Sequence, residues 1–347
     1  MEIAPMLAKA VAAVPDPDSV RGGLRYEPKW DGFRGIVTVD GDDVTIGSRG
    51  AKPLTRYFPE LVETFRAQFG GRDHPVVLDG EVVVRAGEPG AECLDWEALS
   101  QRIHPAASRI RTLSVETPAQ FVAFDLLAVD GSELLDLPFD ERRARLEDLG
   151  ADLADPLFVT QTTLDVALAR EWLTTFEGAG LDGVVAKPRT KPYEPNKRTM
   201  LKVKHHRTAD VVAIGYRVRK SGTGVGSLLV GLYDDDGELR QVGGVSAFTD
   251  KTRLALVEEL DPVVLRDADG RPVTGDGERS RFSSGRDTSF VRLAPERVLE
   301  VRYDQMEGDR FRHTVQFARW RPDRDARSCG FDQLEVPTAY DLREVLR

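Results

Sequence analysis

The pattern of apolar residues changes near residue 210, and this change restricts the possible folds more than any other feature of the sequence. Before it, strand-like apolar runs alternate with stretches that keep a helical period. After it, short strand-like runs follow one another, interrupted by one helical stretch. A chain of 347 residues is long enough for two hydrophobic cores. We therefore expect two domains, residues 1–207 and 208–347.

The first region is predicted to be an α+β domain of antiparallel strands with helices. Asp40-Gly41 is a hairpin signal between two apolar runs. Apolar residues between Phe58 and Phe69 keep the helical period, and Gly70 and Gly71 end the pattern. The other expected elements are strands at 76–84, 121–129, 183–187 and 201–204 and helices at 139–149 and 164–177.

The second region is predicted to be a small β-barrel. One helix is expected at 250–260, and residues 266–289 are expected to form a mobile loop. Five strands with one inserted helix predict a Greek-key barrel of the OB type, a fold that often binds nucleic acid. The expected strands are 211–218, 227–233, 239–245, 298–303 and 311–319.

The distribution of charge favours an anionic substrate. A net charge of −10 argues at first against a nucleic-acid partner. However, five of the ten lysines lie between Lys187 and Lys204, and six arginines lie between Arg310 and Arg327. One charged run is usually a solvated face. Two such runs in an acidic chain favour binding of phosphate groups.

Several classes of protein are excluded by composition. There is no apolar run long enough to cross a membrane and no signal peptide, so we expect a cytoplasmic protein without membrane association. Cys93 and Cys329 form no CxxC pair, and the five histidines show no metal-ligand spacing. We therefore expect no structural zinc.

The stretch from Tyr26 to Arg34 is the most informative for chemistry. Lys29 precedes an Asp-Gly turn, and Arg34 lies five residues after Lys29. An amine and a guanidinium can therefore surround one phosphate. Attack on phosphorus needs the unprotonated amine, and a lysine in water is almost fully protonated at neutral pH. Burial or nearby cations would have to favour the neutral form. A pattern this short also fits a surface lysine at the mouth of a hairpin.

Three other charged residues are informative because of the apolar residues beside them in the sequence. Glu81 interrupts the apolar run 76–84, and burying a carboxylate is costly unless it meets a cation or several donors. Lys202 and Lys204 alternate with apolar residues and so share one face of a strand. That face is either solvated or holds a phosphate between the two ammonium groups. Residues 222–226 are rich in glycine but lack the Lys-Ser/Thr ending of a Walker motif.

These motifs stand in the order typical of the covalent nucleotidyltransferase superfamily, whose nucleophile motif is KxDGxR. Within it, the chain resembles the small two-domain bacterial ATP-dependent DNA ligases of type C. The resemblance covers nearly the whole chain. It rests on KWDGFR at 29–34, SRG at 48–50, LDGE at 78–81, FVAFD at 121–125, DGVVAK at 182–187, LKVK at 201–204 and RWRPDR at 319–324.

The resemblance implies a fold and a set of site residues. The fold is an adenylation (nucleotidyltransferase, ATP-grasp-like) domain followed by an OB-fold domain. The implied catalytic residues are Lys29, Lys202, Lys204, Arg321 and Asp323. The implied nucleotide-binding residues are Glu27, Pro28, Trp30, Arg34, Arg49, Glu81, Phe124, Lys187, Lys202, Lys204 and Arg321. The implied cofactors are ATP and Mg²⁺ or Mn²⁺, with Glu81 and Asp182 as metal-binding residues.

Two positions depart from the family pattern. Asp182 replaces the usual glutamate, so its carboxylate is one methylene shorter and reaches a metal through water or from a closer loop. Asn196 replaces a frequent glycine, and asparagine tolerates left-handed backbone. Phe124 would by default be a core residue, so its role in stacking on adenine is implied by the resemblance alone.

The implied function is ATP-dependent sealing of 5′-phosphate/3′-hydroxyl nicks in double-stranded DNA, through a lysine–AMP intermediate and a DNA-adenylate. DNA repair is the implied process, with a primase-polymerase or an end-binding protein as possible partners and a monomer as the expected state. Lys29 and Arg321 lie in different predicted domains. The second domain is therefore expected to close for the first step about a hinge at 207–210.

Four alternatives to a DNA ligase can be weighed on the sequence. A capping-type guanylyltransferase shares the lysine motif but uses GTP, and an RNA ligase shares the first step. Segments 226–233 and 242–245 favour a DNA ligase over the guanylyltransferase. The expected OB barrel, which ends in the ligase-like motif at 319–324, disfavours the RNA ligase. A nucleic-acid-binding module without catalysis would not need the motif set that includes Lys29. A scaffold acting only through protein contacts has no positive feature in the sequence.

Overall fold

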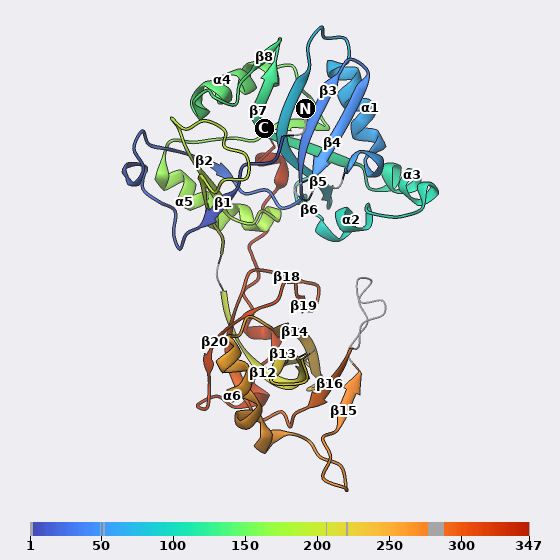
Figure 1. Cartoon of the computed structure of the whole chain (residues 1–347), viewed down its shortest axis with the longest axis vertical. Coiled ribbons are helices and arrows are strands. Elements are labelled where there is room, and N and C mark those ends of the chain that lie inside the picture. The colour runs from blue at the N-terminus through green and yellow to red at the C-terminus, as the bar shows by residue number, and fades with distance from the viewer. Residues whose placement is uncertain are drawn as a thin grey trace. The chain divides into compact units, whose positions relative to one another are not determined.

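The computed structural model describes residues 3–48, 50, 53–205, 207–219, 221–276 and 288–346. Its contacts divide the chain into two compact units (Figure 1). Unit 1 is Met1–His205 with Pro337–Arg347, and unit 2 is His206–Val336. The α+β fold class with an OB-type C-terminal region is confirmed. The exact domain boundary at 207 stays a prediction.

Unit 1 contains a seven-stranded sheet covered by helices. Its strand order is β4 (Asp43–Ser48), β3 (Phe33–Asp40), β5 (Val76–Ala86), β7 (Ala119–Val129) and β8 (Ser132–Glu133), with β6 (Cys93–Leu94) on β5 and β9 (Leu157–Val159) on β7. Helix α1 (Pro59–Phe69) buries Leu61, Phe65 and Phe69 in the core of this sheet. The remaining helices near it are α2 (Trp96–Gln101), α3 (Ala107–Glu116) and α4 (Phe139–Gly150).

A second sheet of four strands carries most of the predicted site residues. Its order is β1 (Ala8–Ala10), β11 (Met200–Val203), β10 (Val184–Pro188) and β2 (Leu24–Pro28). Helix α5 (Val166–Thr175) packs on this sheet and contributes Ala169 and Trp172 to its core. Residues of β2, β5, β7 and β11, from the two sheets, line one pocket.

The strong sequence signals in unit 1 are confirmed. The Asp40-Gly41 hairpin joins β3 to β4, and Gly41 has a φ of +56° that glycine adopts without strain. Asn196 also has a left-handed φ, of +62°. Helices α2 and α3 were missed because each is short, and α3 buries only Ile110 and Leu113.

The segment after Val336 packs on unit 1, a feature that the sequence pattern did not indicate. Leu342, Val345 and Leu346 are buried in the core beneath α5. The Leu342 amide donates to the Glu92 carbonyl at 2.9 Å. The Tyr340 ring lies 5.3 Å from that of Phe176. No periodic apolar pattern predicts the burial of this segment, because its only regular element among the described residues is one short turn at Leu342–Glu344.

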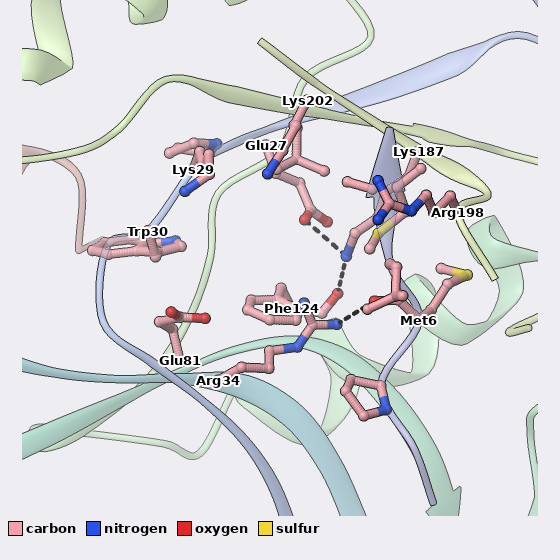
Figure 2. A pocket seen from close by; sticks show the side chains of 16 residues that line it. Met6, Glu27, Lys29, Trp30, Arg34, Glu81, Phe124, Lys187, Arg198 and Lys202 are labelled. Atoms are coloured by element: carbon pink, nitrogen blue, oxygen red, sulfur yellow. Dashed lines mark hydrogen bonds and ion pairs between the residues drawn. The ribbon is translucent and has the colours of Figure 1, made fainter. Parts of the chain in front are cut away.

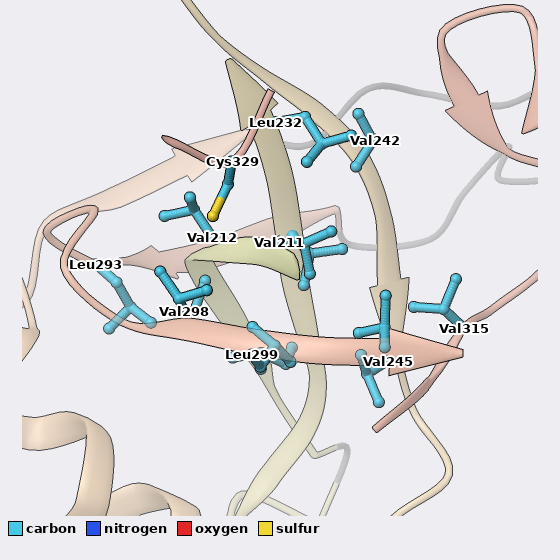
Figure 3. Close-up of a cluster of buried hydrophobic side chains, with 14 of the residues drawn as sticks. Val211, Val212, Leu232, Val242, Val245, Leu293, Val298, Leu299, Val315 and Cys329 are labelled. Atoms are coloured by element: carbon cyan, nitrogen blue, oxygen red, sulfur yellow. The ribbon is translucent and has the colours of Figure 1, made fainter. Parts of the chain in front are cut away.

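Unit 2 is built on an antiparallel seven-stranded sheet around its own core (Figure 3). The sheet order is β14 (Leu239–Val245), β13 (Val225–Tyr233), β12 (Arg207–Val218), β16 (Ser289–Arg292) and β15 (Thr274–Asp276), with β17 (Val298–Tyr303) on β12 and β20 (Gln316–Trp320) on β17. Helix α6 (Asp250–Leu260) lies where a helix was expected. Cys329 is fully buried in this core.

Two expectations for unit 2 need correction. Residues 266–289 are not wholly a loop, because β15 pairs with β16; residues 277–287 lie outside the described part of the chain. The expected strand 311–319 is divided between β19 (Arg310–Phe311) and β20. Strand β19 pairs antiparallel with β18 (Met306–Glu307) across a turn at Gly308, which has a φ of +55°. Strand β19 is therefore separate from β20.

Across the described ranges, the structure has no helix that is both long enough and apolar enough to cross a membrane.

Candidate active site

Lys29 follows β2 directly, and backbone pairing fixes its position. Its amide donates to the Gly183 carbonyl at 2.8 Å, and its carbonyl accepts from the Asp182 amide at 2.9 Å. Gly183 has a φ of +123°, and a Cβ there would lie 2.0 Å from the Val203 carbonyl oxygen. Only glycine fits this position, so the glycine of the DGVVAK motif allows Asp182 to lie beside Lys29.

Asp182 contacts two of the three predicted catalytic lysines at this end of the sheet. Its Oδ2 lies 2.6 Å from Lys29 Nζ and 2.8 Å from Lys204 Nζ. Burial alone would raise the pKa of Asp182, but Lys29 and Lys204 together outweigh burial and hold this pKa below its usual value. The carboxylate therefore stays charged and balances both ammonium groups.

A pocket of about 310 Å³ opens next to Lys29 (Figure 2). In this view the Lys29 and Lys202 side chains lie on one side of the pocket, and Phe124 and Arg34 lie on the other. The side chain of Lys29 is 18% exposed, so its amine is partly shielded from water. The lining includes Glu27, Pro28, Lys29, Trp30, Arg34, Glu81, Phe124, Lys187 and Lys202, all predicted for the site, together with Met6, Arg198 and Met200.

Glu81 faces this pocket from β5. Its Oε1 accepts a hydrogen bond from the Gly32 amide at 3.1 Å. Burial raises the pKa of the Glu81 carboxyl to about 7, and Arg34 and Lys29 oppose that rise. A Cβ at Gly32 would lie 2.1 Å from the Val82 carbonyl oxygen, so the glycine of the Asp-Gly turn lets the nucleophile loop lie against β5. A cation beside Glu81 would offset the cost of its charge.

Arg34 is held by a carboxylate that the sequence analysis did not assign. Asp79 is fully buried and accepts two hydrogen bonds from the Arg34 guanidinium. The guanidinium carbon lies 4.4 Å from the centre of the Phe124 ring. The argument applied to Glu81, that a buried acid in an apolar strand needs a partner, applies equally to Asp79 and could have found it.

Glu27 and Lys187 form a buried ion pair at the back of the pocket. Lys187 Nζ lies 2.8 Å from Glu27 Oε2 and donates to the Phe124 carbonyl at 2.8 Å. Burial raises the pKa of Glu27, and Lys187 opposes this effect. Glu27 Oε1 is buried without a hydrogen-bond partner, although it belongs to a residue that lines the pocket.

The other predicted residues are Arg49, Arg321 and Asp323. Arg49 lies outside the described residues. Arg321 and Asp323 belong to unit 2, where the Arg321 guanidinium donates to both Asp323 and Asp210. The hydrogen bond from the Arg321 side chain is the main cause that lowers the pKa of Asp323 to about 2. In the described ranges, no cluster of three or more His, Cys, Asp or Glu residues could hold a metal ion by itself.

Comparison with known families accounts for both units. A model of the ATP dependent DNA ligase domain matches residues 5–204, and a model of the ATP dependent DNA ligase C terminal region matches residues 221–324. The chain belongs to the ATP-dependent DNA ligases. The sequence-based recognition of a small bacterial ligase of this family is confirmed, and ATP and nicked DNA are its substrates.

Two DNA ligases of mycobacteria are similar in sequence to nearly the whole chain. It is 54% identical to DNA ligase C1 of Mycolicibacterium smegmatis over 349 residues, covering 99% of this chain and 97% of that protein. It is 52% identical to DNA ligase C of Mycobacterium tuberculosis over 359 residues, with the same coverage of 99% and 97%. It is also 33% identical over 242 residues to the multifunctional non-homologous end joining DNA repair protein LigD of M. tuberculosis, covering 68% of this chain and 29% of that protein.

Proposed function

We propose that this ligase seals nicks through an AMP group carried on Lys29. The unprotonated amine attacks the α-phosphorus of ATP, a nitrogen–phosphorus bond forms, and pyrophosphate leaves. The 5′-phosphate of the nick then displaces Lys29 from AMP, and the proton returns to the amine. In the last step the 3′-hydroxyl attacks the activated 5′-phosphate, AMP leaves, and the hydroxyl proton passes to solvent.

The observation that carries this proposal is the position of the Lys29 amine. It lies at the edge of a pocket that also presents Lys202, Glu81 and Phe124. A phosphate there would meet ammonium groups, and a flat base would find an aromatic ring. In the state described, Asp182 holds the Lys29 ammonium at 2.6 Å. Attack therefore requires that Lys29 lose its proton and that this ion pair be replaced.

The charge that develops on phosphorus needs further cations. Lys202 and Lys204 alternate on β11 and its continuation, and both lie near the Lys29 end of the sheet. Arg321, in unit 2, is proposed to orient the pyrophosphate with Asp323. Because Lys29 and Arg321 belong to different units, the first step is proposed to require closure of unit 2.

A divalent cation, Mg²⁺ or Mn²⁺, fits the donors of this site. Glu81 and Asp182 would hold it, and ATP phosphates and water would complete its shell, since Mg²⁺ commonly takes one or two carboxylates and keeps several waters. The raised pKa of Glu81 marks a carboxylate that lacks sufficient positive charge nearby. When bound, the cation would neutralise charge on the phosphates. Asp182 would exchange part of its contact with Lys29 for it, which leaves that amine freer to lose its proton.

We further propose a role in DNA repair, as a cytoplasmic monomer. The relative named as a DNA repair protein supports this role. A primase-polymerase or an end-binding protein remains the expected kind of partner. Light scattering of the purified ligase at assay concentration tests the monomer, and a stable dimer would contradict it.

The proposal is tested by a nick-sealing assay that compares ATP, GTP and NAD⁺ on DNA and RNA junctions. We expect sealing of nicked DNA with ATP and a Lys29→Ala variant that takes up no label from α-labelled ATP. Sealing with GTP alone, or joining of RNA only, would replace this function by that of a related nucleotidyltransferase. Labelling that persists in Lys29→Ala would show that another residue carries AMP.

A further inference from the structure

Tyr193 connects two walls of the nucleotide pocket through its hydroxyl group. The side chain is 3% exposed and does not itself line the pocket. Its hydroxyl donates to Asp79 Oδ2 at 2.6 Å and accepts from the Met6 amide at 2.9 Å. The hydroxyl therefore uses its donor and an acceptor position at once, on one group from β5 and one from the N-terminal segment.

The first connection leads to Arg34. Asp79 is fully buried, and its two oxygens accept from the Nε and Nη2 atoms of Arg34. Such a paired contact fixes the plane of the guanidinium as well as its position. Tyr193 supplies the third donor to this carboxylate and restricts its rotation. The orientation of Arg34 over the Phe124 ring thus depends on the Tyr193 hydroxyl.

The second connection leads to the segment Pro5–Ala8, which forms another wall of the pocket. Besides the bond to Tyr193, the Met6 carbonyl accepts from Arg34 Nη2 at 3.4 Å (Figure 2). Tyr193, Asp79, Arg34 and Met6 therefore form a closed ring of hydrogen bonds. A closed ring is more rigid than separate contacts, because no member can rotate without breaking two bonds.

We propose that Tyr193 is a positioning residue for the nucleotide, which fixes Arg34 and the Pro5–Ala8 wall in the geometry that receives ATP. This inference rests on the proposed function of the pocket. Burial, followed by the charge of Asp79, raises the pKa of the Tyr193 phenol far above its usual value. The hydroxyl keeps its proton at every pH at which the enzyme is assayed, so the ring of hydrogen bonds persists.

The test is Tyr193→Phe, which removes the hydroxyl and keeps the ring. We expect the ATP concentration for half-maximal self-adenylation to rise about 10-fold, because a hydrogen bond to a charged group is lost. The maximal rate at saturating ATP should change by less than about threefold, since Lys29 is not touched. The increase in melting temperature caused by ATP should shrink in parallel and reports binding without any activity.

Tyr26→Phe is the matched control. Tyr26 is also buried in unit 1, and its hydroxyl donates to the Pro15 carbonyl at 2.7 Å. Neighbouring residues of a strand point to opposite faces, so the Tyr26 side chain lies away from Glu27 and the pocket. A loss of melting temperature shared by both variants, with no change in half-saturation for either, would overturn the inference. If the unmodified ligase takes up no label from ATP, the proposed function itself fails.

Discussion

Asp182 Oδ2 lies between Lys29 Nζ and Lys204 Nζ, at 2.6 and 2.8 Å. The carboxylate therefore forms an ion pair with the proposed nucleophile and with one of the lysines proposed to bind phosphate. This arrangement explains how two ammonium groups lie close together. It also makes Asp182 the residue whose contacts must change when the reaction begins.

Substitution of Asp182 tests this relationship. Asp182→Asn removes the charge that would attract a metal and release Lys29, so we expect self-adenylation to slow by about 100-fold. Asp182→Glu restores the residue usual in the family and should stay within about 10-fold of the unmodified rate. Rapid mixing with labelled ATP measures both. Equal rates for Asp182→Asn and the unmodified enzyme would remove Asp182 from the reaction.

Glu81 gives a prediction that depends on pH. Its pKa rises from 4.5 to about 7 on folding, mainly through burial, so the folded enzyme holds a proton that the unfolded chain has released. The stability that this residue contributes is present below pH 4.5 and is lost as the pH rises through about 7. Glu81→Gln abolishes this titration. The melting temperature of Glu81→Gln minus that of the unmodified ligase should therefore increase from pH 5 to pH 8, because the pKa of about 7 lies within this range.

That experiment is carried out in EDTA without nucleotide, so that no cation stabilises the carboxylate. The same Glu81→Gln variant should lose about 100-fold in self-adenylation, so stability and activity move in opposite directions. Glu63→Gln on the exposed side of α1 controls for the removal of one negative charge. A melting difference for Glu81→Gln that is independent of pH would contradict the burial effect.

The C-terminal segment should contribute measurably to the stability of unit 1. Leu342 is fully buried, and Leu342→Ala is expected to lower the free energy of unfolding by about 2–4 kcal/mol. Arg343→Ala is the control, because half of its side chain is exposed and the substitution removes an ion pair with Glu92 rather than buried apolar packing. Urea unfolding followed by tryptophan fluorescence measures both. Equal losses would mean that the segment is held by charge rather than by packing.

The strongest patterns in the sequence predicted the fold, and the weakest parts were missed for a physical reason. The apolar run Val76–Val84 and the helix at 250–260 each contain enough residues to define a period. The segment around Leu342 does not, because its partner surface comes from residues far away in the chain. The structure brings Lys29, Glu81 and Phe124 together around one pocket, and their roles in the reaction stay predictions.

Tyr193 shows the limit of sequence reasoning at this site. Nothing in the local sequence YEPNKR indicates that this hydroxyl meets Asp79 and Met6, which are 114 and 187 residues away. Asp79 itself could have been found, since a buried acid in an apolar strand requires a partner. The identity of that partner depends on how β3 pairs with β5, in a register that places Arg34 opposite Glu81.

Arg321 tests whether the two units cooperate in one step. Arg321→Ala should slow self-adenylation by about 100-fold, because the pyrophosphate loses its guanidinium. Sealing of a nick that already carries AMP should change by less than about threefold, since pyrophosphate takes no part in it. Arg319→Ala is the control, because Arg319 belongs to the same motif as Arg321 and its side chain pairs with Glu300. Equal losses in both steps for Arg321→Ala would contradict closure of unit 2.

The central claim is that Lys29 carries AMP, and peptide mapping by mass spectrometry tests it most directly. The purified ligase is incubated with ATP and Mg²⁺, digested and mapped, with Lys29→Arg treated in the same way. We expect one AMP adduct, on the peptide that contains Lys29, and none in the variant, because an arginine keeps its proton and cannot attack phosphorus. An adduct on any other residue, or one that survives in Lys29→Arg, would contradict the account.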